Sequence, residues 1–204
     1  GDTFLWYPEP GRGSGNFSTS ATWRALHHNS LEVCWHKVVW FAGRVPKHAF
    51  ITWIAARDRM VTRDKLIRWG LRVPASCVLC PSHEESRNHL FFYCTFSNQV
   101  WTFFTSRLHL SPPQGFEAIL RWLNAPSRDP SITLIVRLIF QAVLYLVWKE
   151  RNSRVHAGVE KPHSAIVAEV QQIIRFRLDP LARRQVLASG QSSVLAVWFS
   201  FFDG

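Results

Sequence analysis

Residues 77–94 read Cys-Val-Leu-Cys-Pro-Ser-His-Glu-Glu-Ser-Arg-Asn-His-Leu-Phe-Phe-Tyr-Cys. Three cysteines and one histidine in this stretch follow the pattern Cys-x2-Cys-x8-His-x4-Cys, and these four are Cys77, Cys80, His89 and Cys94. Zn²⁺ in structural sites takes four tetrahedral donors such as thiolate and imidazole, and a two-residue gap lets one tight turn present two thiolates to the same ion. The spacing therefore predicts a structural zinc knuckle, and we expect the rest of the chain to be arranged around it.

Other side chains compete with this ligand set. His83 and Glu85 lie inside the loop and remain alternatives for the fourth position, but His89 is favoured because it opens an apolar run, residues 90–92, that would hold it in place. A free cysteine is often only a small buried apolar residue, although the close spacing favours the metal. Cys34 stands 43 positions before Cys77 and is expected to lie in the core.

A centre with four protein ligands is closed, whereas catalytic zinc keeps one position open for water. We therefore expect the zinc to act as a scaffold and not in hydrolysis. Three thiolates and one neutral imidazole leave the centre with a formal charge of about −1, which calls for nearby donors. Arg72 and Arg87 are close in sequence.

The composition indicates a folded chain with a basic surface. Among 204 residues, 47% are hydrophobic and only 19% are charged, which is enough apolar material for a sizeable core. The formal net charge is +10. A charge of this sign favours polyanionic partners such as nucleic acid or an anionic membrane surface.

The sequence offers no catalytic signature. Neither Tyr-x-Asp-Asp nor two adjacent aspartates occur, so the paired carboxylates of a polymerase are missing. The adjacent histidines His27 and His28 do not suggest a catalytic triad. We expect a protein that is not an enzyme.

The ends of the chain and its apolar stretches give expectations about location. Residues 1–8 lack the basic start and apolar run of a secretory signal. Because Met60 is the only methionine, we expect a processed product or an excised segment. Residues 132–148 resemble a membrane span in length, but Arg137 and Gln141 interrupt them, so a buried amphipathic helix and no membrane partner are expected.

Apolar periodicity and turn residues predict a mostly helical fold. We expect an irregular helical domain organised around the zinc knuckle (residues 1–125) and a C-terminal helical extension (residues 126–204), with a linker-like boundary at Pro126 to Pro130. A short strand is an option at residues 2–6. The first predicted helix begins at Ser18 and is capped by Ser18 or Ser20. A segment that starts at Pro46 is expected to be almost wholly buried. Further helices are predicted over residues 31–41, 63–69, 96–108, 116–123, 132–156 and 164–178.

A series of short segments along the first half of the chain has a defined order and spacing. The segments are Asp2-Thr-Phe-Leu-Trp6, Gly15-Asn-Phe-Ser18, Trp35, Val39-Trp40, Pro46-Lys47, Phe50, Trp53, Arg59-Met-Val-Thr62, Leu66, Trp69-Gly70, Cys77-Val-Leu-Cys80, Glu85-Ser86, His89-Leu-Phe-Phe-Tyr-Cys94 and Val100-Trp101. Read in this order, they closely resemble the zinc-binding region that follows the reverse transcriptase in plant non-LTR (LINE-type) retrotransposons. The resemblance runs from residue 2 to about 102, and Trp148-Lys-Glu-Arg-Asn152 is similar to sequence often found downstream.

The resemblance implies zinc at the same four residues and a role beside a polymerase that acts on RNA and DNA. It also implies a nuclear location. Whether the chain is part of a longer polyprotein or a host-retained protein stays open.

Two functions follow from the residues. The first is a nucleic-acid-binding accessory module, because residues 37–72 hold nine basic and two acidic side chains, a local excess of +7. The proposed contacts to RNA or DNA are Arg57, Lys65, Arg68 and Arg72, with Trp69 as a stacking surface. The second is a protein-interaction module that docks through aromatic helices and the apolar tail, residues 194–202.

Overall fold

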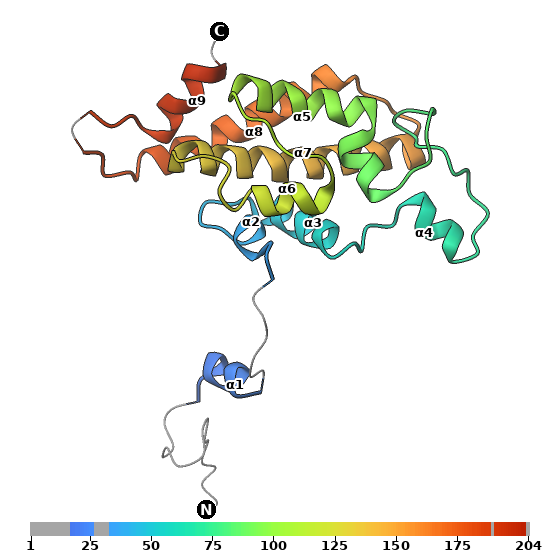
Figure 1. Cartoon of the computed structure of the whole chain (residues 1–204), viewed down its shortest axis with the longest axis horizontal. Helices are drawn as coiled ribbons and strands as arrows, with labels where there is room; N and C mark the ends of the chain where they lie inside the picture. The colour runs from blue at the N-terminus through green and yellow to red at the C-terminus, as the bar shows by residue number, and fades with distance from the viewer. Residues whose placement is uncertain (1–16, 27–32, 189, 203–204) are drawn as a thin grey trace, which may run out of the picture. The chain divides into compact units, whose positions relative to one another are not determined.

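A computed structural model describes residues 17–26, 33–188 and 190–202, and the chain forms two compact units, 1–33 and 34–204 (Figure 1). In the first unit the described part is α1 (Thr19–Leu26). Its first turn is capped by Ser18, whose hydroxyl accepts the backbone N–H of Ala21 at 3.3 Å, as the sequence predicted. The strand considered at residues 2–6 lies outside the described residues.

The second unit is helical, as predicted. Across its described residues the backbone forms no strand, and a single antiparallel bridge joins Ser76 to Glu84. The helices in chain order are α2 (His36–Val39), α3 (Pro46–Ala56), α4 (Arg63–Arg68), the π-helical turn η1 (His89–Tyr93), α5 (Thr95–Arg107), α6 (Phe116–Trp122), α7 (Pro130–Ala157), α8 (His163–Ala182) and α9 (Val194–Phe202).

Helix α7 runs through the middle of this unit and packs against α3, α5, α8 and α9 (Figure 1). Asp129 caps its start by accepting the backbone N–H of Ser131 at 2.7 Å, and Gly158, with φ +62°, ends it in the left-handed conformation. By length and composition α7 could cross a membrane, but 61% of its most apolar window is buried inside the protein. The prediction of a buried helix is confirmed.

An aromatic cluster joins α7 to the segment that follows the zinc knuckle. The Phe140 ring lies 6.2 Å from that of Phe92, 5.9 Å from Trp101 and 6.3 Å from Phe116. All four side chains are buried. Truncating one such phenylalanine typically costs about 3–5 kcal/mol, so this cluster is a main contributor to the core.

The division into domains 1–125 and 126–204 remains a prediction made from the sequence. In space, residues on both sides of it share one core within the unit 34–204.

Three local expectations were wrong. The helix expected over 31–41 is reduced to α2, whose final carbonyls, Val38 and Val39, accept the buried Gln141 amide at 3.0 Å each. Helix α8 does not end at Pro180 but continues to Ala182. The segment from Pro46 is not almost wholly buried, because Phe50 is 53% exposed and Trp53 is half-buried.

The apolar tail forms α9, which packs on α7 and α8 of its own chain. The rings of Phe202 and Phe104 lie 5.6 Å apart. This face of the tail is therefore occupied within the molecule.

Candidate metal centre and nucleic-acid surface

The first two cysteines lie at the tip of a closed loop. Its two arms are joined by backbone hydrogen bonds from Cys77 N–H to the His83 carbonyl (2.7 Å) and from Glu85 N–H to the Ala75 carbonyl (2.9 Å). Cys80 lies in the turn between these arms. The loop thus presents both thiols from one tight turn, as the two-residue spacing predicted.

The other two ligands are brought together by the π-helical turn η1. His89 and Cys94 are five residues apart, which in an α-helix would separate them by roughly 140° around the axis. Here the Cys94 N–H donates to the His89 carbonyl at 2.7 Å, an i to i+5 bond that widens the turn. The wider turn places both side chains on the same side, while Leu90, Phe91 and Phe92 are buried in the core.

The four donors form one buried cluster, with all of their ligand atoms within 4.8 Å of one another. Within this cluster, Cys80 Sγ and His89 Nε2 lie 3.1 Å apart. A tetrahedron with Zn–S of about 2.3 Å and Zn–N of about 2.1 Å has donor separations of roughly 3.5–3.8 Å. The donor set and its size therefore fit Zn²⁺, which would serve as a structural link between the loop and η1.

The local electrostatics favour a thiolate at Cys77. A hydrogen bond from the Cys94 thiol, together with the backbone N–H groups of Cys80 and Leu79, lowers the pKa of Cys77 to about 5. The same shared proton and burial raise the pKa of Cys94. A cation would replace this proton, since zinc ligands bind as thiolates.

The competing ligands are placed elsewhere. Glu85 is fully buried, but its carboxylate pairs with Arg151. The His83 ring is exposed and lies 5.4 Å from that of His89, outside the cluster. Cys34 is exposed and so is not a core residue as expected; its carbonyl accepts the Asn124 amide at 2.9 Å.

Glu85 connects three segments of the molecule. Its carboxylate accepts the Arg151 guanidinium of α7 at 2.8 and 3.2 Å, a bidentate pair. The same group accepts the backbone N–H of Arg63 at 2.9 Å, at the first turn of α4, where a negative charge is favourable. The Glu85 backbone carbonyl accepts the Asp64 N–H at 3.2 Å. One buried carboxylate thus holds α4, the zinc loop and α7 together.

A second pair from α7 lies beside the knuckle. Glu150 is buried and accepts Arg154 Nε and the Lys161 backbone N–H, both at 2.8 Å. Arg154 in turn reaches the Val78 carbonyl inside the knuckle at 3.5 Å. The cation near the sulfur cluster therefore comes from α7, a source that sequence proximity could not indicate.

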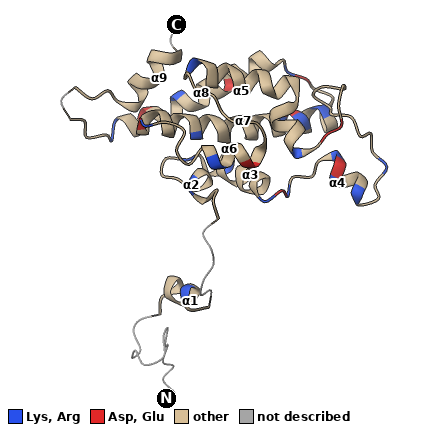
Figure 2. Ribbon diagram, in the orientation of Figure 1, with Lys and Arg blue, Asp and Glu red and all other residues tan. Residues whose placement is uncertain are grey.

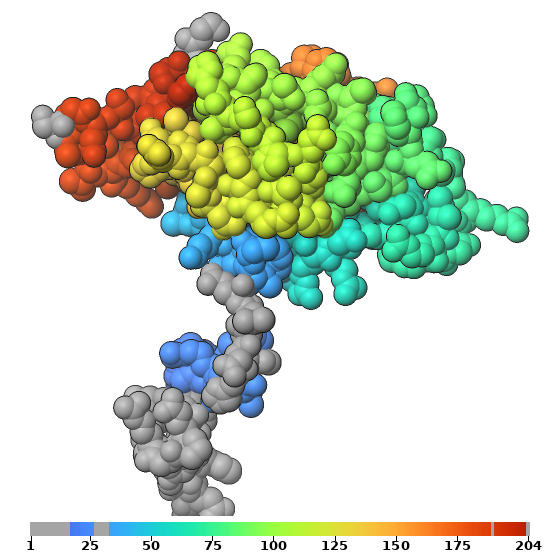
Figure 3. Space-filling model, in the orientation of Figure 1, coloured from blue at the N-terminus to red at the C-terminus, as the bar shows by residue number. Residues whose placement is uncertain are grey.

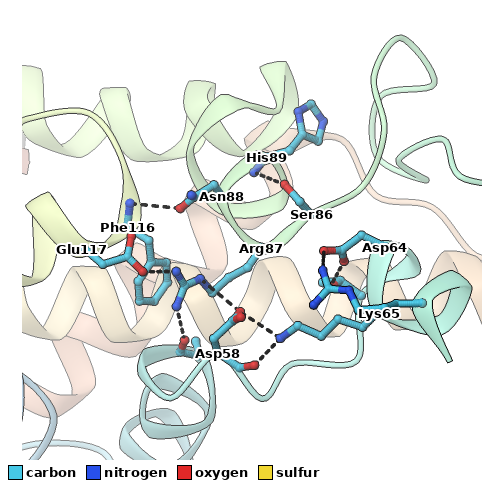
Figure 4. A network of polar contacts seen from close by, with 12 residues as sticks. Asp58, Asp64, Lys65, Ser86, Arg87, Asn88, His89, Phe116 and Glu117 are labelled. Atoms are coloured by element: carbon cyan, nitrogen blue, oxygen red, sulfur yellow. Dashed lines mark hydrogen bonds and ion pairs between the residues drawn. The ribbon is translucent and has the colours of Figure 1, made fainter.

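The sequence suggested Arg72 and Arg87 as hydrogen-bond donors to the zinc centre, but the structure places them elsewhere. Arg72 is exposed. Arg87 donates to the Ala55 carbonyl at 3.0 Å and to Glu117, and its Nε lies 3.5 Å from the Asp58 carboxylate (Figure 4). Arg87 thus joins α3, α6 and the zinc segment.

Lys65 does not belong to the exposed basic set. Its side chain is 10% exposed, and its ammonium contacts both the carboxylate of Asp58, at 2.8 Å, and the Asp58 backbone carbonyl (Figure 4). Asp58 has a left-handed backbone, with φ +52°, so this contact stabilises the turn after α3. The interpretation of Lys65 as a nucleic-acid contact is corrected for this reason.

The other predicted contacts are accessible. Trp69 is 62% exposed and Arg57, Arg68 and Arg72 are exposed as well. Figure 2 shows basic residues on α4 and on the segment that follows it, where Arg68 lies only 3.8 Å from Asp64 in an exposed pair. Such exposed pairs are weak, so this arginine is free to exchange partners.

Sequence reasoning missed the aromatic surface of α3. The rings of Phe50 and Trp53 lie 5.7 Å apart, and the Arg57 guanidinium lies 5.5 Å from the Trp53 ring centroid. The three residues recur at the i, i+3, i+7 spacing of one helix face. That spacing was visible in the sequence, but which face of an apolar helix packs inward was not.

The comparisons with known proteins agree with the metal centre. Residues 17–101 match the family described as zinc-binding in reverse transcriptase, which confirms the suspected resemblance over that region. Neither the curated proteins nor the solved structures gave a significant match. The matched region and the buried cluster together define a zinc-binding region of the type linked to reverse transcriptases.

Proposed function

We propose that the protein is a non-catalytic, zinc-stabilised accessory module that binds RNA or DNA beside a reverse transcriptase, in a retrotransposon of the plant LINE type or as a host-retained derivative. The observation that carries the nucleic-acid part is Trp69, a tryptophan exposed next to Arg68 and close to Arg72. An exposed aromatic ring between cations is suited to a base and its flanking phosphates. A nuclear location is part of this proposal.

The zinc loop supports this role because it fixes the position of α4. Glu85 fixes the first turn of α4 to the zinc loop, so the segment with Trp69 is held on a rigid base. Gly70, with φ +84°, then ends the helix and leaves Trp69 at its exposed end.

Salt-titrated binding to single-stranded RNA, duplex DNA and an RNA–DNA hybrid tests the proposal. We expect affinity to fall steeply with salt, because each phosphate contact releases counterions. Trp69→Ala should weaken binding about tenfold, in line with about 1–3 kcal/mol for one stacked base. Absent or salt-insensitive binding would reject the proposal.

A protein-interaction module is the second candidate, and one observation favours it. Val61, Ile67 and Leu71 are exposed in and beside α4, and exposed apolar side chains that lie near one another can mark a protein interaction site. Under this function the purified protein would not bind nucleic acid alone and would act only within a complex.

A further inference from the structure

Helix α3 carries a row of solvent-facing side chains, the exposed Phe50 and Arg57 with the half-buried Trp53 between them, which we call the α3 ladder. We propose that the α3 ladder binds unpaired bases and so makes this module prefer single-stranded over duplex nucleic acid. This inference rests on the proposed function and specifies its ligand class.

The α3 ladder has the composition of a stacking platform. Phe50 is 53% exposed, and its ring lies 5.7 Å from that of Trp53, with Arg57 over the other end. Every base has a flat π face, but inside a duplex both faces are covered by neighbouring base pairs, and only the end pairs leave one face open. A row of rings on a convex helix surface can therefore stack on successive bases only where these are unpaired.

The charges around the α3 ladder fit a phosphate backbone. Lys47 lies near its start and is exposed, with its ammonium 5.1 Å from the Tyr145 ring, and Arg59 is exposed just after its end. The only carboxylate between residues 44 and 63 is that of Asp58, which is already engaged by Lys65 and Arg87. Residues 44–63 therefore contribute several exposed cations and a single carboxylate that is already paired, which favours a polyanion over an acidic protein partner.

The C-terminal end of the α3 ladder lies next to α4, the helix that leads to Trp69. The contact between Lys65 and Asp58 joins α4 to the end of α3, and Figure 3 shows both segments at the surface on the lower edge of the compact unit. From Phe50 to Arg57 the row spans seven residue steps, or about 10 Å of helix. It accommodates two or three nucleotides, and the strand would extend from there to Trp69.

The test uses the zinc-loaded full chain and fluorescence anisotropy. The probes are a labelled ten-nucleotide oligouridine and a blunt duplex of the same length. The variants are Phe50→Leu, Phe50→Leu with Trp53→Leu, and Phe50→Tyr. The matched control is Phe176→Leu, because Phe176 is 69% exposed beside an exposed Arg175 on α8.

We expect the double variant to bind the single strand at least tenfold more weakly with an unchanged salt dependence, because no charge is removed. Phe50→Leu alone, a surface change that should not disturb folding, should lose about threefold, while Phe50→Tyr and Phe176→Leu should stay within twofold of the wild type. Binding to the duplex should change less than binding to the single strand.

Two outcomes would overturn the inference and leave the proposed function intact, and a third would end both. If the wild type binds the single strand and Phe50→Leu and the double variant bind equally well, the α3 ladder is not a contact and the proposed function stands. If the variants lost affinity equally for the single strand and the duplex, the inference would also be rejected. If the wild type binds neither probe, the proposed function fails, and capture of a protein through the same residues would assign the surface to that partner.

Discussion

At the scale of single residues, Glu85 shows how a buried charge can organise a fold. Removing a carboxylate and a guanidinium from water is costly, and the pair is tolerable only when its hydrogen bonds are satisfied. Glu85 and Arg151 meet this condition, since the carboxylate also accepts the Arg63 backbone N–H. Both residues belong to the segments that carried the family resemblance, and their contact gives each of those segments a structural role.

Arg151→Met should destabilise the protein by about 3–5 kcal/mol, because it leaves the Glu85 carboxylate buried without its cation. Urea unfolding monitored by circular dichroism would measure the loss. The matched control is Arg183→Met, which breaks the exposed pair of Arg183 and Asp179 on α8 and should cost no more than about 0.5 kcal/mol. Equal effects of the two variants would contradict the buried-pair account.

His48 gives a prediction about pH. Burial, and the neighbouring Lys47, lower the pKa of His48 to about 4, below the ordinary value of 6.5. Between these values the unfolded chain binds the proton and the folded one does not, so this contribution to stability is present above pH 6.5 and is lost as pH falls toward 4. The loss should be roughly 1 kcal/mol per pH unit.

His48→Phe should remove this part of the pH dependence, because phenylalanine does not titrate. The change should be tolerated, since the buried Nε2 of His48 has no hydrogen-bond partner among the described residues and the ring packs tilted against Tyr145, with centroids 4.5 Å apart. The measurement is the difference in urea midpoint between pH 7 and pH 5.5. Acid also releases zinc, but equally in both proteins. The exposed control His156→Gln should show the pH dependence of the wild type. A His48→Phe protein that is as pH-sensitive as the wild type would refute the assignment.

At the scale of elements, the ligand set could be predicted from sequence but its geometry could not. Thiolate and imidazole donors at close spacing identify a metal site by chemistry alone. The π-helical turn that unites His89 and Cys94 follows from packing of residues 90–92 in the core, which no local pattern reveals. Likewise, the sequence could not show that Glu85 pairs with Arg151, 66 positions away, and that its carboxylate is therefore not a zinc ligand.

Helix α7 is the element on which the zinc region depends. It supplies Phe140 to the aromatic cluster, Gln141 to α2 and Arg151 to Glu85. A chain ending at residue 125 should therefore lack a cooperative thermal transition even with zinc present. A chain ending at residue 190, which lacks only α9, should retain a transition at lower temperature. A sharp transition in the shorter chain would instead support residues 1–125 as an independent domain.

At the scale of the whole molecule, apolar periodicity predicted a helical protein and composition predicted a basic one, but neither showed which surface is basic and aromatic. A net charge of +10 is a sum over the chain, and Lys65 shows that a basic residue can be internal. Conversely, Phe50 shows that an aromatic residue can be exposed. Only the packing of α3 against α7 decides which residues reach solvent.

Zinc should contribute to the stability of the entire unit, because its ligands come together only when the loop and η1 are packed. Cys94→Ser or treatment with a strong chelator should lower the melting temperature by more than about 10 °C, equivalent to several kcal/mol for a chain of this size. Calorimetry with and without chelator measures this. An unchanged melting temperature would mean that the fold does not need the ion.

The most direct measurement is the zinc content of the purified protein, compared among the wild type, Cys80→Ser and the control Cys34→Ser. The account predicts one zinc per chain in the wild type and in Cys34→Ser, whose cysteine is exposed and outside the cluster, and a large loss of zinc in Cys80→Ser. A wild type free of zinc, or a Cys80→Ser variant with full zinc content, would contradict it.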